Sequence, residues 1–308
     1  MPERRQAEAW TSAPERGSAW LLRAMARLSL RCGRPASRAV LYLIVIYYLL
    51  AAPRAARESR RYLRRALGRE PGLRDRFHHL LYFATAIHDR VYLLNDRFEQ
   101  FAIEIHGEAL LQRALLEGQG CFLMGAHLGS FEVSRAVGRR HAGVVVVMAM
   151  YAANARKISA VLAAINPHAA PLIIGLGSLD AMLQIRARLD EGAFVGVLGD
   201  RTLGNEPVQC VPFLGVPAQF PVGPWRAAAL LRRRVLFIAG LYCGSNRYRI
   251  VIDELADFSE LAAAGRDAAI GAAIDRYAAL LERYCRSHPY NWFNFLDFWH
   301  ESPAPIAA

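Results

Sequence analysis

Residues 121–132 read Cys-Phe-Leu-Met-Gly-Ala-His-Leu-Gly-Ser-Phe-Glu, and the organisation of the chain can be worked out from this stretch. The apolar run 121–124 predicts a buried strand, and glycines at 125 and 129 suit a tight turn from that strand into a helix. Positions five apart on one helix point about 140° away from each other. His127 and Glu132 can therefore meet only if His127 lies in the turn and Glu132 in the first helical turn.

In that arrangement the pair is suited to proton transfer. Glu132 can accept one imidazole N–H, which fixes the tautomer and leaves the second nitrogen of His127 free as a base. A structural role competes with this interpretation, because a histidine near a strand end is often simply hydrogen-bonded. The helix dipole also favours a glutamate in any first helical turn. Spacing alone leaves both interpretations open.

Strands and helices alternate outward from this stretch. Further strands are predicted at 143–150, 171–174, 193–199, 235–243 and 248–255. Helices are predicted at 72–101, 130–141, 154–165, 178–191, 224–233 and 267–287. Continuous apolar strands such as 144–150 are typical of a parallel sheet that is buried on both faces. The sequence therefore predicts an α/β fold with a mainly parallel central sheet flanked by helices.

A second polar pair follows another predicted strand. Asp200 and Arg201 come directly after the strand 193–199, as His127 follows the strand 121–124. Ligands of open parallel sheets bind beside the carboxyl ends of the strands, so we expect Asp200 or Arg201 within about 10 Å of the His127 imidazole. A local ion pair or helix cap is the alternative interpretation of these two residues.

The N-terminal quarter holds all the excess positive charge. The net charge is +11, and residues 1–79 contain 17 arginines against 6 acidic residues, whereas residues 80–308 are balanced at 21 each. The same quarter contains an uncharged apolar run, 39–52, between arginine-rich flanks. This run of 14 is shorter than the roughly 18 to 20 residues of a spanning helix. It predicts a helix in or on an anionic membrane surface, and a buried core helix is the alternative.

We therefore divide the chain into a basic, apolar, membrane-associating segment, residues 1–67, and an α/β domain, residues 68–308. Helices are expected in the first segment at 20–30, 36–52 and 55–67. Nucleic-acid binding fits poorly, because the basic segment carries no recognisable binding motif.

Other classes of function lack their motifs. The five cysteines form no Cys-x-x-Cys pair, which argues against a disulfide framework or a zinc site. There is no His-Glu-x-x-His motif, so we expect no catalytic metal and no cofactor. There is also no Gly-x-Ser-x-Gly elbow, which disfavours a serine lipase or esterase.

The block from Gly125 to Glu132 resembles the His-x4-Asp/Glu motif of the glycerolipid acyltransferase superfamily. The chain is most similar to the lipid A late acyltransferase family, the lauroyl/myristoyl type. Three further stretches resemble that family in the expected order, and the likeness runs from about residue 20 to residue 300. They are 194–201, ending in Asp200-Arg201; 211–223, with Phe220-Pro221 and Gly223; and the Trp-containing block 289–299.

This resemblance implies a membrane-associated O-acyltransferase at the cytoplasmic face of a bacterial inner membrane. The donor would be an acyl thioester of acyl carrier protein or coenzyme A, and the acceptor a hydroxyl of a lipid or glycolipid. His127 would be the base and Glu132 its orienting partner. Backbone N–H groups around Gly129, or the Arg201 guanidinium, would stabilise the oxyanion. The resemblance also assigns substrate binding to Gly129, Asp200, Arg201, Phe220, Pro221 and Gly223.

The acceptor is left open by the C-terminal block. Lipid A enzymes usually carry basic residues there, whereas this chain has Asn291, Asn294 and Asp297. Similar tails in relatives imply other glycolipids or aryl polyene lipids as acceptors. Two alternatives remain: a thioesterase that uses the same His-Glu pair with water, and a non-catalytic membrane-binding protein. Arginines at 226 and 232–234 are candidate contacts for an acidic carrier protein or a phosphate, and a solvated basic face is the alternative interpretation.

Overall fold

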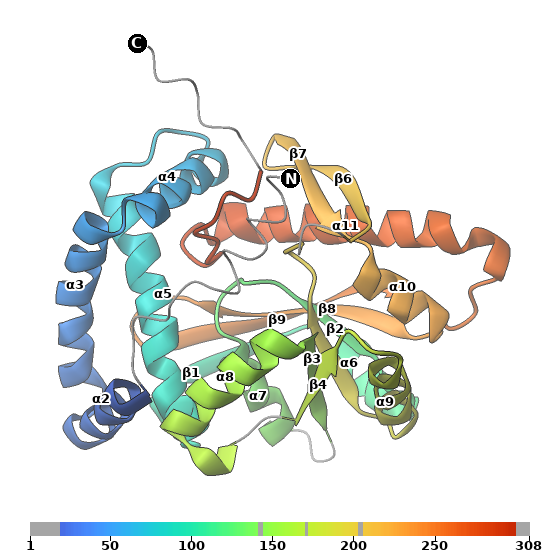
Figure 1. Ribbon diagram of the computed structural model, residues 1–308, viewed down its shortest axis with the longest axis horizontal. Coiled ribbons are helices and arrows are strands. Elements are labelled where there is room, and N and C mark those ends of the chain that lie inside the picture. The colour runs from blue at the N-terminus through green and yellow to red at the C-terminus, as the bar shows by residue number, and fades with distance from the viewer. Residues whose placement is uncertain (1–18, 141–143, 170–171, 203–205, 300–308) are drawn as a thin grey trace.

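The computed structural model describes residues 19–140, 144–169, 172–202 and 206–299. A central sheet crosses the molecule, with helices on both of its faces and a layer of N-terminal helices at one side (Figure 1). The larger helices are α2 (Ala19–Cys32), α3 (Arg34–Ala51), α4 (Pro53–Leu67), α5 (Leu73–Leu94), α6 (Glu108–Leu116), α7 (Phe131–Arg140), α8 (Ala152–Ile165), α9 (Leu179–Asp190), α10 (Gly223–Leu230) and α11 (Arg266–Ser287).

The sheet has seven strands in the order β1-β9-β8-β2-β5-β3-β4. Every neighbouring pair is parallel except β8 and β9, which form an antiparallel hairpin. A separate antiparallel pair is formed by β6 and β7. The bounds are β1 (Ala102–His106), β2 (Phe122–Gly125), β3 (Val146–Tyr151), β4 (Leu172–Leu176), β5 (Phe194–Leu198), β6 (Val208–Phe213), β7 (Val216–Pro221), β8 (Arg234–Tyr242) and β9 (Arg247–Asp257). The expected α/β fold with a mainly parallel sheet is confirmed.

Alternate residues of the central strands face two different cores. In β2, Phe122 and Met124 join the larger core with α10 and α11, whereas Leu123 joins the second core with α5, α6 and α7. All four residues of β2 are buried, as expected for a strand covered on both faces. The strand is therefore held firmly, and the turn after it has a fixed starting point.

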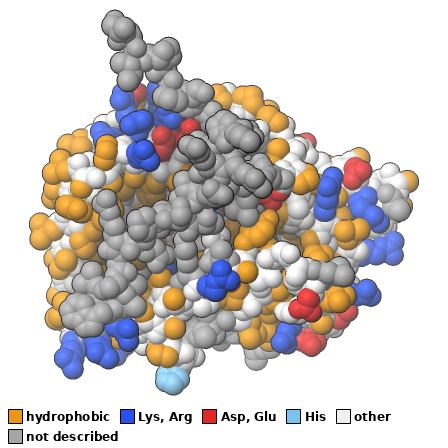
Figure 2. Space-filling model, viewed as in Figure 1, with side chains coloured by type: hydrophobic (Ala, Val, Ile, Leu, Met, Phe, Trp, Pro, Cys, Tyr) orange, Lys and Arg blue, Asp and Glu red, His pale blue; other side chains and the backbone are white. Residues whose placement is uncertain are grey.

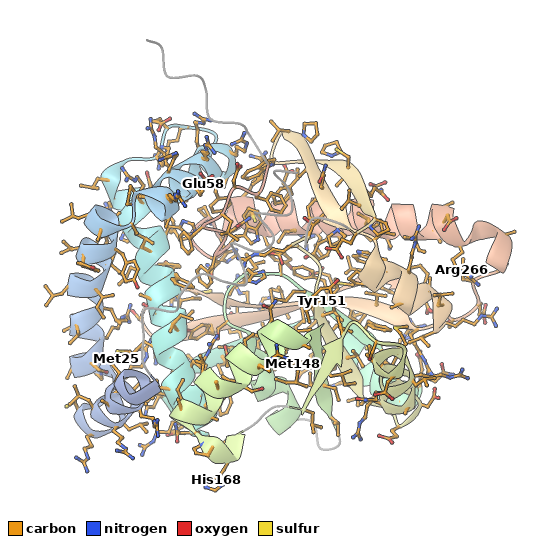
Figure 3. All side chains as sticks on the ribbon, in the orientation of Figure 1. Met25, Glu58, Met148, Tyr151, His168 and Arg266 are labelled. Carbon is orange, nitrogen blue, oxygen red and sulfur yellow. The ribbon has the colours of Figure 1, made fainter. Side chains whose placement is uncertain are left out.

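The N-terminal helices form a layer that is joined to the rest of the fold. One face of α3 packs on α5 through Leu41 and Val45 against Leu80 and Leu81. Tyr62 and Leu63 of α4 belong to the larger core. Figure 3 shows that Met25 of α2 and Arg266 of α11 lie at opposite ends of the molecule. The boundary that we drew at residue 67 thus passes through a shared core.

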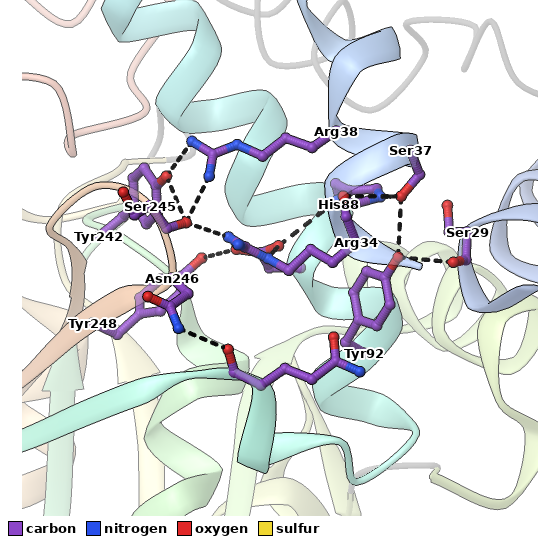
Figure 4. Close-up of polar contacts among 12 residues, drawn as sticks. Ser29, Arg34, Ser37, Arg38, His88, Tyr92, Tyr242, Ser245, Asn246 and Tyr248 are labelled. Carbon is purple, nitrogen blue, oxygen red and sulfur yellow. Dashed lines mark hydrogen bonds and ion pairs between the residues drawn. The ribbon is translucent and has the colours of Figure 1, made fainter. Parts of the chain in front are cut away.

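A buried polar cluster fixes α3 to α5 and β9 (Figure 4). Arg34 donates from Nε to Asp89 Oδ1 at 2.7 Å and from Nη2 to Asp89 Oδ2 at 2.8 Å. Tyr248 adds its hydroxyl to Asp89 Oδ2 at 2.7 Å, and Arg38 donates to the carbonyl of Ser245 at 2.6 Å. Because Asp89 is completely buried, the Arg34–Asp89 pair defines where α3 can lie.

Helix α3 is also the candidate for membrane contact. Among the described residues it alone has the length and hydropathy of a spanning helix, with 18 residues and a mean hydropathy of 1.3, and 17% of it is buried. Its outer face exposes large apolar side chains: Val40, Leu43, Ile46, Tyr47 and Leu50.

Some elements differ from those predicted. The helix expected at 72–101 ends at Leu94, and the chain then turns into the edge strand β1, which the sequence analysis missed together with α6 and the β6–β7 hairpin. In β1 exposed and half-buried residues alternate over only five positions, which gives a weak apolar signal. The remaining strands and helices lie within a few residues of their predicted positions.

Candidate active site

His127 lies in the turn between β2 and α7, at the carboxyl edge of the sheet. Asp200 follows β5, the strand that neighbours β2. The His127 Nδ1 is 2.9 Å from Asp200 Oδ1, and the backbone N–H of His127 donates to Asp200 Oδ2 at 2.9 Å. The expectation that Asp200-Arg201 lies close to the imidazole is confirmed.

The contact with Asp200 settles which nitrogen of His127 carries the proton. Burial alone would raise the pKa of Asp200, but His127 and Arg201 together hold it well below its usual range, so Asp200 is a carboxylate. A carboxylate only accepts hydrogen bonds, and Nδ1 of His127 must therefore be the N–H. No described residue is bonded to Nε2, and the side chain is 30% exposed. The second nitrogen is available as a base.

Glu132 does not make the contact that we expected. It lies in the first turn of α7, as predicted, but its described contacts are with Arg90 of α5 and with Ser130. Arg90 Nε lies 2.6 Å from Glu132 Oε1, and the Ser130 hydroxyl donates to Oε2 at 3.2 Å. The expectation that Glu132 orients the imidazole is wrong for this structure, because the carboxylate from the neighbouring strand occupies that position.

Arg201 lies beside the same carboxylate and reaches the C-terminal segment. Its Nη2 donates to the carbonyl of Phe293 at 3.0 Å. Burial lowers the pKa of Arg201 to about 10, and Asp200 opposes part of that shift. The guanidinium is therefore still charged at neutral pH, close enough to His127 to act on its pKa.

Two backbone N–H groups around Gly129 make hydrogen bonds that hold the turn. Gly129 has a φ of +72°, and an added Cβ would come within 2.1 Å of the Gly240 carbonyl oxygen. Its N–H donates to the Asn291 carbonyl at 2.8 Å, and the N–H of Ser130 donates to the Gly240 carbonyl at 2.8 Å. These two amides already donate within the fold, which favours Arg201 over them as the group that would stabilise an oxyanion.

Phe220, Pro221 and Gly223 lie at the end of the β6–β7 hairpin and the start of α10. Phe220 is completely buried and packs on Phe213 and Tyr277, with ring centroids 5.6 and 5.9 Å apart. Gly223 is exposed. The structure thus gives Phe220 a packing role, and substrate contact by this ring would require the aromatic cluster to open.

One direct neighbour of Asp200 was not predicted from the sequence. Trp292 is completely buried, and its indole N–H donates to Asp200 Oδ2 at 2.9 Å. The signal was present in the Trp-containing block 289–299, but a tryptophan in an aromatic run is equally typical of a core. Only the fold shows that this segment returns to the His127 turn.

Two of the arginines suggested for an acidic carrier protein, Arg233 and Arg234, lie at the other edge of the sheet. Arg234 begins β8, at its amino end, and pairs with Glu117 at 2.9 Å and Asp257 at 2.8 Å. Arg233 pairs with Asp190. These charges are compensated within the chain and are remote from the carboxyl edge. Within the part of the chain that the structure describes, no cluster of three or more His, Cys, Asp or Glu could hold a metal ion.

Comparison with known proteins identifies the family. A sequence profile described as bacterial lipid A biosynthesis acyltransferase matches residues 81–301 of the 308. The chain belongs to this acyltransferase family. A comparison with individual curated proteins finds no match. The matched region includes the His127 turn, Asp200-Arg201 and Trp292, so the family assignment covers every residue of the candidate site.

Proposed function

We propose that this protein transfers a fatty acyl group from an acyl thioester to a hydroxyl of a lipid or glycolipid acceptor at a membrane surface. The donor would be acyl carrier protein or coenzyme A, and the acceptor lipid A-like, a related glycolipid or an aryl polyene lipid. One observation supports the chemistry most directly. In a member of an acyltransferase family, a buried carboxylate holds Nδ1 of His127 and leaves Nε2 available.

In this mechanism Nε2 of His127 takes the proton of the acceptor hydroxyl. The oxygen attacks the thioester carbonyl, the new C–O ester bond forms and the C–S bond breaks. The imidazolium then returns its proton to the departing thiolate. Burial lowers the pKa of His127, and although Asp200 opposes this effect the imidazole is neutral and able to act as a base at physiological pH.

Arg201 and Glu132 would support this step from two sides. The charged Arg201 lies next to the base, where its guanidinium stabilises negative charge on the carbonyl oxygen, an interaction worth about 3 kcal/mol in other enzymes. Glu132 would act through its partner Arg90, which it holds at the start of α7. The roles of Gly129 and Phe220 would be to shape the turn and the core beneath it.

The membrane contact would be made by the outer face of α3. Apolar side chains gather along the edge of the molecule where α3 lies, with arginines at both ends of that edge (Figure 2). The arginines Arg54, Arg57, Arg60 and Arg64 of α4 are exposed. Since the inner face of α3 is bonded to α5, we expect the helix to lie against the cytoplasmic surface of the bacterial inner membrane rather than cross it alone.

Purified protein given acyl carrier protein or coenzyme A thioesters tests the chemistry, with mass spectrometry of the products. Acyl ester formed only with a lipid acceptor supports the proposal. Acyl release that does not depend on an acceptor would show a thioesterase. Absence of turnover with every thioester would show a non-catalytic protein.

Sedimentation with anionic vesicles tests the membrane contact. Serine replacements of Leu43 and Leu50, which are 69% and 80% exposed on α3, should lower the bound fraction. The matched control is Leu116→Ser on α6, which removes an equally apolar side chain that is 89% exposed. Equal binding by both variants would exclude this face of α3 as the contact.

A further inference from the structure

The C-terminal segment 291–293 runs alongside the His127 turn as an added short strand. Leu128 and Trp292 form an antiparallel bridge, the N–H of Gly129 donates to the Asn291 carbonyl at 2.8 Å, and the N–H of Phe293 donates to the His127 carbonyl at 2.7 Å. The side chain of Asn291 is bonded to both backbone groups of Tyr242, at 2.8 and 3.1 Å. The segment is thus held between the turn and β8.

The Trp292 ring is fixed by its neighbours as well as by its N–H. It packs edge-on against Tyr62 of α4, Phe213 of β6 and Phe298, with centroids 5.0, 5.3 and 5.0 Å away. Its indole N–H donates to the same Asp200 oxygen that accepts the backbone N–H of His127. Rotation of the Asp200 carboxylate would break both of these bonds together with the one to Nδ1.

A second buried histidine holds the backbone of Trp292. His79 of α5 is completely buried, with Nε2 2.9 Å from the Trp292 carbonyl oxygen and Nδ1 2.8 Å from the Ser59 hydroxyl of α4. A carbonyl only accepts, so Nε2 carries the proton and Nδ1 accepts from Ser59. Burial lowers the pKa of His79 to about 4, so this histidine is uncharged at neutral pH.

We propose that Trp292 and His79 are positioning residues for the base, and that Ser59, His79, Trp292, Asp200 and His127 form one buried hydrogen-bonded chain from α4 to the reacting nitrogen. This inference rests on the proposed function, in which His127 is the base. Trp292 and His79 are completely buried and act through Asp200. Their effect therefore concerns the orientation and proton affinity of His127 rather than substrate affinity.

The test is Trp292→Phe, with Trp225→Phe as its matched control. Trp225 is also completely buried, but its indole N–H has no hydrogen-bond partner among the residues that the structure describes. Both changes remove the same atoms from a core, and only one removes a donor to Asp200. We expect kcat of Trp292→Phe to fall about tenfold relative to the control, with KM unchanged.

The pH profile separates positioning from a merely structural effect. Without the indole donor, the negative charge of Asp200 acts more strongly on His127 and favours the imidazolium. The acid limb of the kcat profile should then move about one unit to higher pH in Trp292→Phe, and not in Trp225→Phe. Identical kcat values and identical profiles for the two variants would overturn the proposal.

A measurement on the unmodified protein covers the case in which Trp292→Phe does not fold. In protein labelled with ¹⁵N-tryptophan, the Trp292 indole N–H signal should shift with the titration of His127, whereas the Trp225 signal should not. If the Trp292 signal does not shift as His127 titrates, the proposed chain of hydrogen bonds is overturned. The NMR result needs no substrate, so it stands even if the protein transfers no acyl group and the proposed function fails.

Discussion

Two aspartates of this protein are completely buried, and their surroundings are opposite in kind. Asp89 accepts three hydrogen bonds, two of them from the guanidinium of Arg34, so its charge is neutralised by direct contact. Asp200 also accepts three, but from a backbone amide, an imidazole and an indole, none of which carries a charge when His127 is neutral. A buried ion pair with a bidentate partner fixes two elements together, whereas the Asp200 carboxylate, with the charge of Arg201 beside it, is directed by its hydrogen bonds at His127.

The largest expected effect is at His127, the last residue of the hydrogen-bonded chain that passes through Asp200. Replacing His127 by Ala removes the proposed base and should lower transfer by about two to four orders of magnitude. The measurement is the initial rate with an acyl thioester and a lipid acceptor, alongside circular dichroism to confirm folding. A folded variant that keeps more than a tenth of the rate would exclude His127 as the base.

Asp200→Asn should have nearly as large an effect by reversing the tautomer. To keep the bonds from the His127 and Trp292 N–H groups, the amide must turn its oxygen to them and its NH₂ to Nδ1 of His127. Nδ1 then accepts, the proton moves to Nε2, and the base is lost. We expect kcat to fall by about two orders of magnitude or more.

The corresponding change at the other aspartate should affect stability instead. Arg34→Met leaves Asp89 buried without its counter-ion and should lower the free energy of unfolding by about 3–5 kcal/mol. The rate per folded molecule should not change. The matched control is Arg54→Met, at an exposed position of α4, which should alter stability by no more than about 0.5 kcal/mol. Denaturant unfolding of both variants distinguishes them, and equal stabilities would contradict the assigned role of Arg34.

Glu132→Gln extends the comparison of Asp89 and Asp200 to a third carboxylate, which also has an arginine partner. Its contacts are with Arg90 and Ser130, so we expect a rate loss of about tenfold from one weakened charge-assisted contact. Rates of the Glu132→Gln and Asp200→Asn variants should be measured together. If the glutamate variant is the more damaged, Glu132 rather than Asp200 controls the base.

The smallest expected effect is a displacement of the acid limb in the pH profile of the unmodified protein. Burial lowers the pKa of His127 from its ordinary value of 6.5, and only the neutral imidazole accepts a proton. Activity should therefore be lost as the pH falls through this lowered pKa, with the midpoint of the acid limb below 6.5. A midpoint above that value would show that Asp200 outweighs burial.

Strands with continuous apolar sequence were predictable, and so was the proximity of the residues that follow them. His127 and Asp200 each come after a buried strand, and the rule for parallel sheets places such residues at one edge. The sequence does not reveal that β2 and β5 are direct neighbours, because strand order depends on how the crossover helices pack. For this reason the spacing favoured Glu132, which is close in sequence, over Asp200, which is adjacent in the sheet.

The contribution of the C-terminal segment to the candidate site could not be predicted from local sequence patterns. A hydrogen bond between Trp292 and Asp200 joins residues 92 positions apart, and neither has a periodic neighbour that indicates the other. The edge strand β1 and the β6–β7 hairpin were missed because they are short and partly exposed, so tertiary pairing rather than propensity stabilises them.

The order in which the chain is made gives the added strand at 291–293 a further consequence. The ribosome completes all nine strands of the described structure before it reaches Asn291, and until then the N–H of Gly129 and the carbonyl of His127 lack the partners that they have in the folded protein. Contacts so distant in sequence form late, because closing a long loop costs entropy that other contacts must first offset. A nascent chain with a folded sheet would thus hold His127 against Asp200 but lack the Trp292 indole N–H and the backbone bonds of the added strand, so this site is completed only after translation has passed residue 293.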